Sequence, residues 1–348
     1  MDTNQVTSEA TRAEFYQRAG GQNLAPLWTV LHGLVTKEPV TPMKAAMWKY
    51  KDVRPYLMEA CDIISTKEAE RRVMILENPG LTGQQRITHS LFGGLQIILP
   101  GEVAPAHRHA AAALRFIIEG KDAYTAVGGE RTMMNPGDFV ITPSMTWHDH
   151  GNIGKVPMVW LDVLDMHLVN LMDASFLDFY PDATHPVTRP EGAAEAEAAF
   201  NLVPDGQEWT SQTTPIFNYP YARTREALEK LRKFRAPDPY HGFRMKYINP
   251  VTGGWAMPTI STWMALLPKG FTTQPYRSTD STGFVVVEGE GKSTIGGQTF
   301  EWGPRDIFVA PSWQFHEHVA SSDAVIFQFS DRVVQEKLDF WREHRGNA

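Results

Sequence analysis

Three histidine pairs, each separated by one residue, have the clearest potential for chemistry in this 348-residue chain. The pairs are His107/His109, His148/His150 and His316/His318. Squaring the histidine frequency (12 of 348) and multiplying by the chain length predicts roughly 0.4 such pairs by chance. Residues i and i+2 of a β-strand project from the same face, so one pair can place two imidazoles beside one ion. This spacing therefore indicates metal binding.

A metal held by the first pair needs a third ligand from another strand. His148 and His150 both follow two strands joined at Gly128-Gly129, and the spacing does not choose between them. The chain has a single cysteine, Cys61, which excludes an internal disulfide and a thiolate site. We therefore expect the ligands to be histidine or carboxylate.

Charged residues in strand-like runs are further candidates. Arg115 lies six residues after His109, so in an unbroken strand it shares the inward face and could bind a carboxylate with its guanidinium fork; an outward or interdomain side chain is the alternative. Asp162, within the apolar run 159–163, must be functional or paired with a nearby arginine. His150 is either an acid or base near the metal or a hydrogen-bonded core residue.

The elements that must position these residues are short β-branched and aromatic runs separated by glycine and proline. They predict antiparallel strands. Segment 114–150 aligns with 283–318 with one gap, which indicates a duplicated barrel. The second copy has Tyr276 and Ser278 where the first has its histidine pair. We therefore expect its histidines, His316 and His318, to pack or form hydrogen bonds without a metal.

We expect five regions: an N-terminal helical arm (1–85), a metal-binding barrel (86–182), a connecting region with a helix (183–255), a second barrel without metal (256–332) and a C-terminal helix (333–348). The net charge of −7 does not favour nucleic acid or anionic lipid. Apolar stretches are far shorter than the roughly 18 residues that span a bilayer, and the start of the chain lacks a signal pattern. We expect a cytoplasmic protein with no nucleic-acid or membrane partner.

A set of spaced motifs resembles the cupin family: Gly101, His107-x-His109, Gly120, Pro136-Gly137-Asp138 and His148-x-x-x-Asn152. The resemblance implies a mainly β bicupin, with two double-stranded β-helix (jelly-roll) barrels, and His148 as the third ligand. Ala113 or Leu114 replaces the glutamate that often follows the histidine pair. Three neutral imidazoles would leave about three octahedral positions free, which suits a bidentate organic anion together with O2.

More specifically, the chain resembles the gentisate 1,2-dioxygenase family, which includes salicylate and 1-hydroxy-2-naphthoate dioxygenases. The segments that carry this resemblance are 26–28, 70–72, 78–81, 94–96, 99–105, 107–109, 114–117, 147–152, 160–162 and 249–254. The resemblance implies Fe(II) bound by His107, His109 and His148. It also implies a homotetramer and a substrate pocket lined by Arg71, Gln96, Arg115, His150 and Asp162.

The implied reaction is cleavage of gentisate (2,5-dihydroxybenzoate) by O2 to maleylpyruvate, in aromatic-compound catabolism. Arg115 and Arg71 would neutralise the substrate carboxylate, and His150 with Asp162 would move hydroxyl protons. The alternatives are ring cleavage of salicylate or 1-hydroxy-2-naphthoate at the same site, or a non-catalytic bicupin that binds a ligand. Residues 92–93 and 110–113 depart from the family pattern and could reshape the pocket.

Overall fold

The computed structural model describes residues 8–199 and 202–346, in which residues up to Val40 form a compact unit of their own. This arm contains α1 (Glu9–Gly20) and α2 (Leu27–Leu34). The Ser8 hydroxyl caps α1 by accepting a hydrogen bond from the Thr11 amide at 3.2 Å. No residue of α2 is buried although the helix is apolar, and Trp28 is 65% exposed. The arm therefore carries an exposed apolar helix face.

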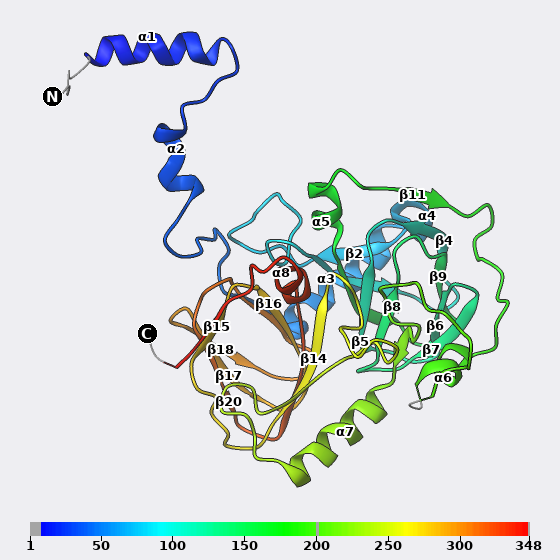
Figure 1. Ribbon diagram of the computed structural model, residues 1–348. Helices are drawn as coiled ribbons and strands as arrows, with labels where there is room; N and C mark the ends of the chain where they lie inside the picture. Colours follow the sequence, from blue (N-terminus) through cyan, green and yellow to red (C-terminus); the bar gives the residue numbers. More distant parts are fainter. Residues whose placement is uncertain (1–7, 200–201, 347–348) are drawn as a thin grey trace. The chain divides into compact units, whose positions relative to one another are not determined.

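The rest of the chain forms two barrels, each built from two antiparallel sheets (Figure 1). One sheet of the first barrel has the order β12-β8-β5-β10-β3-β2, and the other has the order β11-β4-β9-β6-β7. These strands are β2 (Arg72–Ile75), β3 (Phe92–Ile98), β4 (Val103–His109), β5 (Ala113–Glu119), β6 (Ala123–Val127), β7 (Glu130–Met134), β8 (Phe139–Thr142), β9 (His148–Asn152), β10 (Met158–Leu164), β11 (Leu177–Phe179) and β12 (Asn218–Tyr219).

The second barrel has the sheet orders β1-β19-β16-β21-β14-β13 and β18-β17-β20-β15-β22. Its strands are β1 (Ala46–Trp48), β13 (Phe243–Lys246), β14 (Ser261–Leu267), β15 (Tyr276–Ser278), β16 (Thr282–Glu288), β17 (Gly291–Ile295), β18 (Gln298–Trp302), β19 (Ile307–Ala310), β20 (His316–Ala320), β21 (Ala324–Ser330) and β22 (Glu343–Arg345). Strands β5 to β9 of the first barrel correspond in order and pairing to β16 to β20 of the second. The predicted mainly β fold with two jelly-roll barrels is confirmed.

Two strand–helix–strand segments connect the barrels, and each has one strand in the first barrel and one in the second. The first is β1, α3 (Tyr50–Ile63) and β2, whose strands pair with β19 of the second barrel and β3 of the first. The second is β12, α7 (Tyr221–Phe234) and β13, whose strands pair with β8 of the first barrel and β14 of the second. Each connection therefore supplies one edge strand to the first barrel and another to the second.

The aspartates shared by both halves of the repeat hold the starts of these helices. The Asp138 Oδ1 accepts a hydrogen bond from the Tyr221 amide of α7 at 2.8 Å, and the Asp306 Oδ1 accepts one from the Tyr50 amide of α3 at 2.9 Å. The first amides of a helix lack partners within it, and its dipole favours a negative charge there. The repeated aspartate therefore has a structural role.

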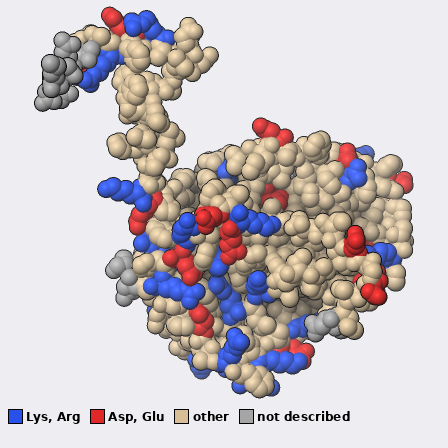
Figure 2. Space-filling model, in the orientation of Figure 1, with Lys and Arg blue, Asp and Glu red and all other residues tan. Residues whose placement is uncertain are grey.

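One hydrophobic core extends through both barrels. Phe116 of β5 stacks on Phe327 of β21 with ring centroids 4.2 Å apart, so the large sheets of the two barrels pack against each other. On the surface, α7 is attached to the second barrel by ion pairs such as Arg232–Asp323 at 2.7 Å. Figure 2 shows positive and negative side chains interleaved over the lower left of this unit.

The boundaries of the predicted terminal and connecting regions differ from the observed elements. The predicted arm (1–85) also contains β1 and β2, and the predicted connection (183–255) contains β12 and β13, because runs of two to four residues are too short to show a strand period. The predicted C-terminal helix (333–348) is only α8 (Arg332–Lys337). The helix ends here because Asp339 has a φ of 58° and the Phe340 amide donates to the Gln335 carbonyl. Strand β22 follows. Residues 347–348 of the predicted helix lie outside the described residues.

Three short helices complete the described chain, namely α4 (Thr66–Ala69), α5 (Met166–Leu171) and α6 (Ala193–Ala198). A search of the described residues finds no helix with both the length and the apolar character that crossing a membrane requires.

Asp331, which precedes α8, is expected to make stability depend on pH. Burial, with a contribution from Asp280, raises its pKa to about 6. Because this exceeds the unfolded value of about 3.9, the folded chain binds the proton more tightly, and stability falls as pH rises from about 4 to 6. We expect Asp331→Asn to raise the free energy of unfolding by about 1–3 kcal/mol at about pH 8 and to have little effect at about pH 4. Urea denaturation at both pH values measures this, and equal effects would contradict it.

Candidate metal centre

His107, His109 and His148 lie together inside the first barrel. Strand β4 carries the first two, and β9 pairs with β4 so that His148 is the register partner of His107. One ring nitrogen of each histidine lies within 4.8 Å of the other two. His107 and His148 are each 1% exposed. The fold therefore brings three imidazoles from two strands to one buried point.

Backbone carbonyls fix the orientation of all three rings. Each Nδ1 donates to a carbonyl two residues away along the chain: His107 to Pro105 at 3.0 Å, His109 to Ala111 at 2.6 Å and His148 to Thr146 at 2.9 Å. Because a carbonyl can only accept, Nδ1 carries the proton and Nε2 keeps a lone pair. The Nε2 atom of His148 is buried and has no hydrogen-bond partner. A buried acceptor without a donor is costly, and a bound metal ion would satisfy it.

The surroundings keep these imidazoles neutral. Burial, reinforced by the positive charge of Arg71, lowers the pKa of His107 to about 3. Burial also lowers the pKa of His109 and takes that of His148 well below its ordinary value. Since only neutral imidazole binds a metal, the cluster is in its binding form at neutral pH. The donor set therefore fits a divalent transition metal such as iron.

Arg71, at the residue before β2, lies against this cluster. Its Nη2 atom is 2.7 Å from Nε2 of His107 and also contacts Nδ1 of the same ring. Burial lowers the pKa of Arg71 to about 10, so the side chain remains a cation at neutral pH. The Nε2 atom of His107 cannot accept from Arg71 and bind an ion at once. Arg71 and a metal are therefore alternative partners of that nitrogen.

Arg115 and Asp162 form a buried ion pair on neighbouring strands. They are direct register partners on β5 and β10, their Nε and Oδ1 atoms are 3.3 Å apart, and they are 3% and 6% exposed. The other carboxylate oxygen accepts from the Trp160 indole at 2.9 Å, and Arg115 also donates to the Thr142 hydroxyl. Burial raises the pKa of Asp162, and the charge of Arg115 opposes that rise. The arginine is therefore held in one position beside the histidines.

His150 and Gln96 complete the set of residues predicted for the pocket. The Thr125 hydroxyl donates to the Asp149 carbonyl at 3.5 Å, so it accepts from Nδ1 of His150 at 2.9 Å and leaves Nε2 of that ring as an acceptor. The His150 ring centroid is 5.7 Å from that of His148. Gln96 on β3 is 2% exposed, in register with Trp160 on β10.

Three supporting residues were absent from the sequence-based prediction. Thr125 orients His150, whereas Thr142 and Trp160 orient the Arg115–Asp162 pair. Trp160 lies two residues before Asp162, so period-2 spacing could have placed both on one face. The threonines carry no such signal, because their partners come from other strands and depend on register.

A buried histidine cluster inside a jelly-roll barrel, with a second barrel repeating the strand order, defines the cupin class. The Cupin domain model matches residues 94–164 and 262–329. The chain is 53% identical over 341 residues to gentisate 1,2 dioxygenase 1 of Aquipseudomonas alcaligenes, covering 98% of both chains. It is 38% identical to the 5-aminosalicylate 1,2-dioxygenase of Comamonas sp, covering 92% of this chain and 87% of the relative.

A solved structure agrees with these relatives along the whole chain. Salicylate 1,2-dioxygenase from Pseudoaminobacter salicylatoxidans, in adducts with gentisate, matches with a TM-score of 0.92 at 30% identity, covering 100% of this chain and 99% of that one. The chain therefore belongs to the gentisate 1,2-dioxygenase family of ring-cleaving dioxygenases.

Proposed function

We propose that this chain cleaves the ring of gentisate with O2 to give maleylpyruvate, and that His107, His109 and His148 hold Fe(II). The observation that carries the proposal is the convergence of these three neutral imidazoles beside the buried Arg115–Asp162 pair. The 53% identical relative named as a gentisate dioxygenase supports the choice of substrate. When bound, ferrous iron would supply the redox centre at which O2 and the substrate react. Both oxygen atoms enter the product, so no external reductant is needed.

The arginines of the site provide recognition of the substrate carboxylate. The planar guanidinium of Arg115 can donate two parallel hydrogen bonds to a carboxylate, and its position is fixed by Asp162 and Thr142. Arg71 supplies a second cation once it leaves His107. Together they neutralise the acid group and fix the orientation of the aromatic ring.

His150 is suited to accept the proton of a ring hydroxyl. Its Nδ1 is engaged by Thr125, so Nε2 is the free base, and burial with the nearby arginines holds its pKa well below the ordinary value. The ring is therefore neutral at neutral pH, and its Nε2 lone pair is free to receive the hydrogen of a ring hydroxyl. Asp162 supports this chemistry by keeping Arg115 in place, and Gln96 contributes an amide to the pocket wall.

An aerobic assay with a panel of aromatic acids tests this function. The full chain, loaded anaerobically with Fe(II), is given gentisate, salicylate, 5-aminosalicylate or 1-hydroxy-2-naphthoate, and O2 uptake and ring absorbance are followed. We expect one O2 consumed per gentisate, and a kcat/KM for gentisate at least about tenfold above the others.

The same protein loaded with Zn(II) is the matched control, because zinc accepts the same ligands without redox chemistry. Zinc-loaded protein should be inactive. A higher kcat/KM for salicylate or 1-hydroxy-2-naphthoate would support the alternative substrates. Absence of O2 uptake with every acid would support a non-catalytic ligand-binding bicupin.

We also propose that the protein is a cytoplasmic homotetramer. The exposed apolar face of α2 supports subunit contacts through the arm, since Trp28 and Leu34 are 65% and 68% exposed. The single cysteine is consistent with a reducing compartment.

A further inference from the structure

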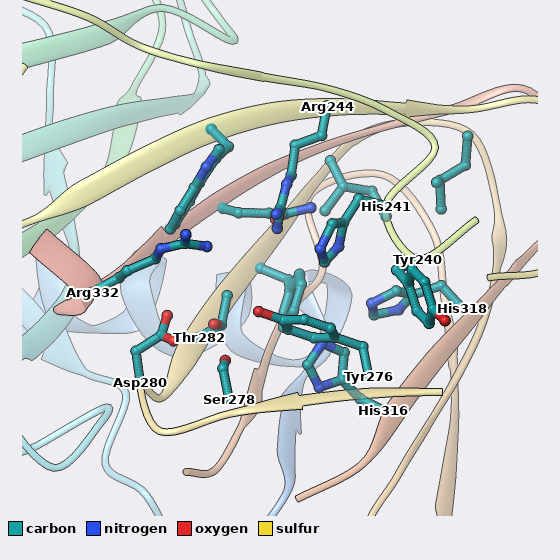
Figure 3. Close-up of a pocket in the computed structure, with 15 residues that line it drawn as sticks. Tyr240, His241, Arg244, Tyr276, Ser278, Asp280, Thr282, His316, His318 and Arg332 are labelled. Carbon is teal, nitrogen blue, oxygen red and sulfur yellow. The ribbon is translucent and has the colours of Figure 1, made fainter. Parts of the chain in front are cut away.

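The second barrel contains a cavity lined by its own histidine pair, His316 and His318, the repeat counterparts of His148 and His150 (Figure 3). Tyr276 of β15 and Phe284 of β16 also line it. Its volume is about 20 Å³, and a single water needs roughly 10–15 Å³. The cavity therefore has room for one water-sized ligand and is too small for an aromatic acid.

Arg244 of β13 brings a positive charge to this cavity without an ionic partner. Its guanidinium donates to the Gln328 side-chain oxygen at a long 3.4 Å and lies 5.2 Å from the Trp263 ring centroid. It forms no ion pair with any of the described residues. Burial lowers its pKa to about 10, which leaves it charged at neutral pH. A desolvated cation without a counter-ion is unfavourable.

The first barrel contains a buried arginine–aspartate ion pair that the second barrel lacks. There, Arg115 faces Asp162 across β5 and β10. At the corresponding register of the second barrel Phe284 faces Gln328, which is uncharged. The second barrel therefore has a cation from its edge strand and no carboxylate at the register position that balances the first barrel; Asp280, elsewhere on the cavity wall, attracts Arg244 without forming an ion pair with it.

His241, in the loop before β13, has a ring nitrogen without a partner. Its Nε2 atom is buried and has no hydrogen-bond partner. Figure 3 shows its ring directed into the cavity beside the Arg244 guanidinium. With the proton on Nε2, the ring would donate to the same point as the arginine. Arg244 has one long hydrogen bond and His241 Nε2 has none, so both can donate to a ligand that carries lone pairs and negative charge.

The other charged groups of the cavity wall are already engaged. Asp280 lies on the side of Arg332 (Figure 3), and its Oδ1 accepts from the Trp341 indole at 2.8 Å. Arg332 donates to Glu336 at 2.7 Å. These contacts leave Arg244 and His241 as the groups that can hold an additional ligand.

We propose that the second barrel binds one small monovalent anion between Arg244 and His241. A halide ion, which is a single atom, fits the volume and the donors. The positive charge of Arg244 disfavours a metal cation in the same place. The bound anion neutralises the arginine, so it stabilises the folded chain by binding only to that state.

A bromide soak of crystals of the full-length, metal-loaded protein locates the ligand directly. We expect an anomalous bromine peak within hydrogen-bonding distance of Arg244 and His241, and its loss in Arg244→Met. Arg131→Met is the matched control, because Arg131 of the first barrel also lies over an aromatic ring, 3.8 Å from the centroid of Tyr124. Crystals of this variant should keep the bromine peak. Absence of a peak in this cavity, while surface bromide sites are occupied, would overturn the proposal.

Thermal unfolding measures the consequence in solution. At constant ionic strength, replacing bulky gluconate with chloride or bromide should raise Tm by about 2–4 °C for wild type and Arg131→Met. An equal rise in Arg244→Met would show binding elsewhere and refute the site.

His241→Phe provides a second variant that keeps the arginine. It should shift half-saturation to at least about tenfold higher anion concentration, because one donor to a charged ligand is lost. This variant decides the question if Arg244→Met fails to fold, and unchanged half-saturation would then count against the site. None of these readouts measures turnover, so they separate this proposal from the proposed ring cleavage.

Discussion

Replacing His148 with alanine is expected to abolish metal binding and to lower kcat/KM for gentisate by at least about 1000-fold. His148 is the proposed ligand from the second strand of the cluster, and its Nε2 atom is the buried acceptor without a donor. Two histidines on β4 alone would leave a weak, open chelate. Metal content after anaerobic loading with Fe(II), together with O2 uptake, measures both effects.

His316→Ala is the matched control for this variant. His316 occupies the same place in the repeat, is also buried, and has its Nδ1 3.4 Å from the Gln314 carbonyl. Its removal leaves the first barrel intact, so activity per folded molecule should stay within about twofold of wild type. Full iron content in His148→Ala, or equal loss of activity in both variants, would contradict the assigned ligand.

Replacing Arg115 with methionine is expected to damage both activity and stability. Loss of the guanidinium fork should lower kcat/KM by about 100- to 1000-fold, because Arg115 is the proposed charged partner of the substrate carboxylate. Asp162 would then be a buried carboxylate without its ion pair, which costs about 3–5 kcal/mol in the free energy of unfolding. Steady-state kinetics and urea denaturation measure the two losses.

A double variant separates these two roles of Arg115. In Arg115→Met/Asp162→Leu both charges are removed, so stability should return to within about 1–2 kcal/mol of wild type while activity stays low. Arg115→Lys should retain the charge yet recover only part of the activity, because a lysine cannot make the bidentate contact. Recovery of activity in the double variant would show that Arg115 matters only for folding.

Much of the architecture follows from local patterns in the sequence. The i, i+2 spacing placed His107 and His109 on one strand, and the alignment of 114–150 with 283–318 indicated two copies of one barrel. Both signals are periodic and local, because strand alternation and duplication repeat within a few residues or along one continuous segment. Arg115 is buried as expected, at 3% exposed, but the premise of an unbroken strand from His109 was wrong, because β4 ends at His109 and β5 begins at Ala113 in the other sheet.

Only the tertiary structure decided which distant groups meet. Without the family resemblance, the sequence left His148 and His150 equivalent, whereas the register of β4 with β9 sets His148 opposite His107, and Thr125 engages His150. The sequence likewise did not show that β1 and β13 pair with the second barrel, or that Arg244 lacks an ion pair. The physical reason is that register and edge pairing are set by side chains far apart in the chain, which fit together only when the two barrels pack on a shared core.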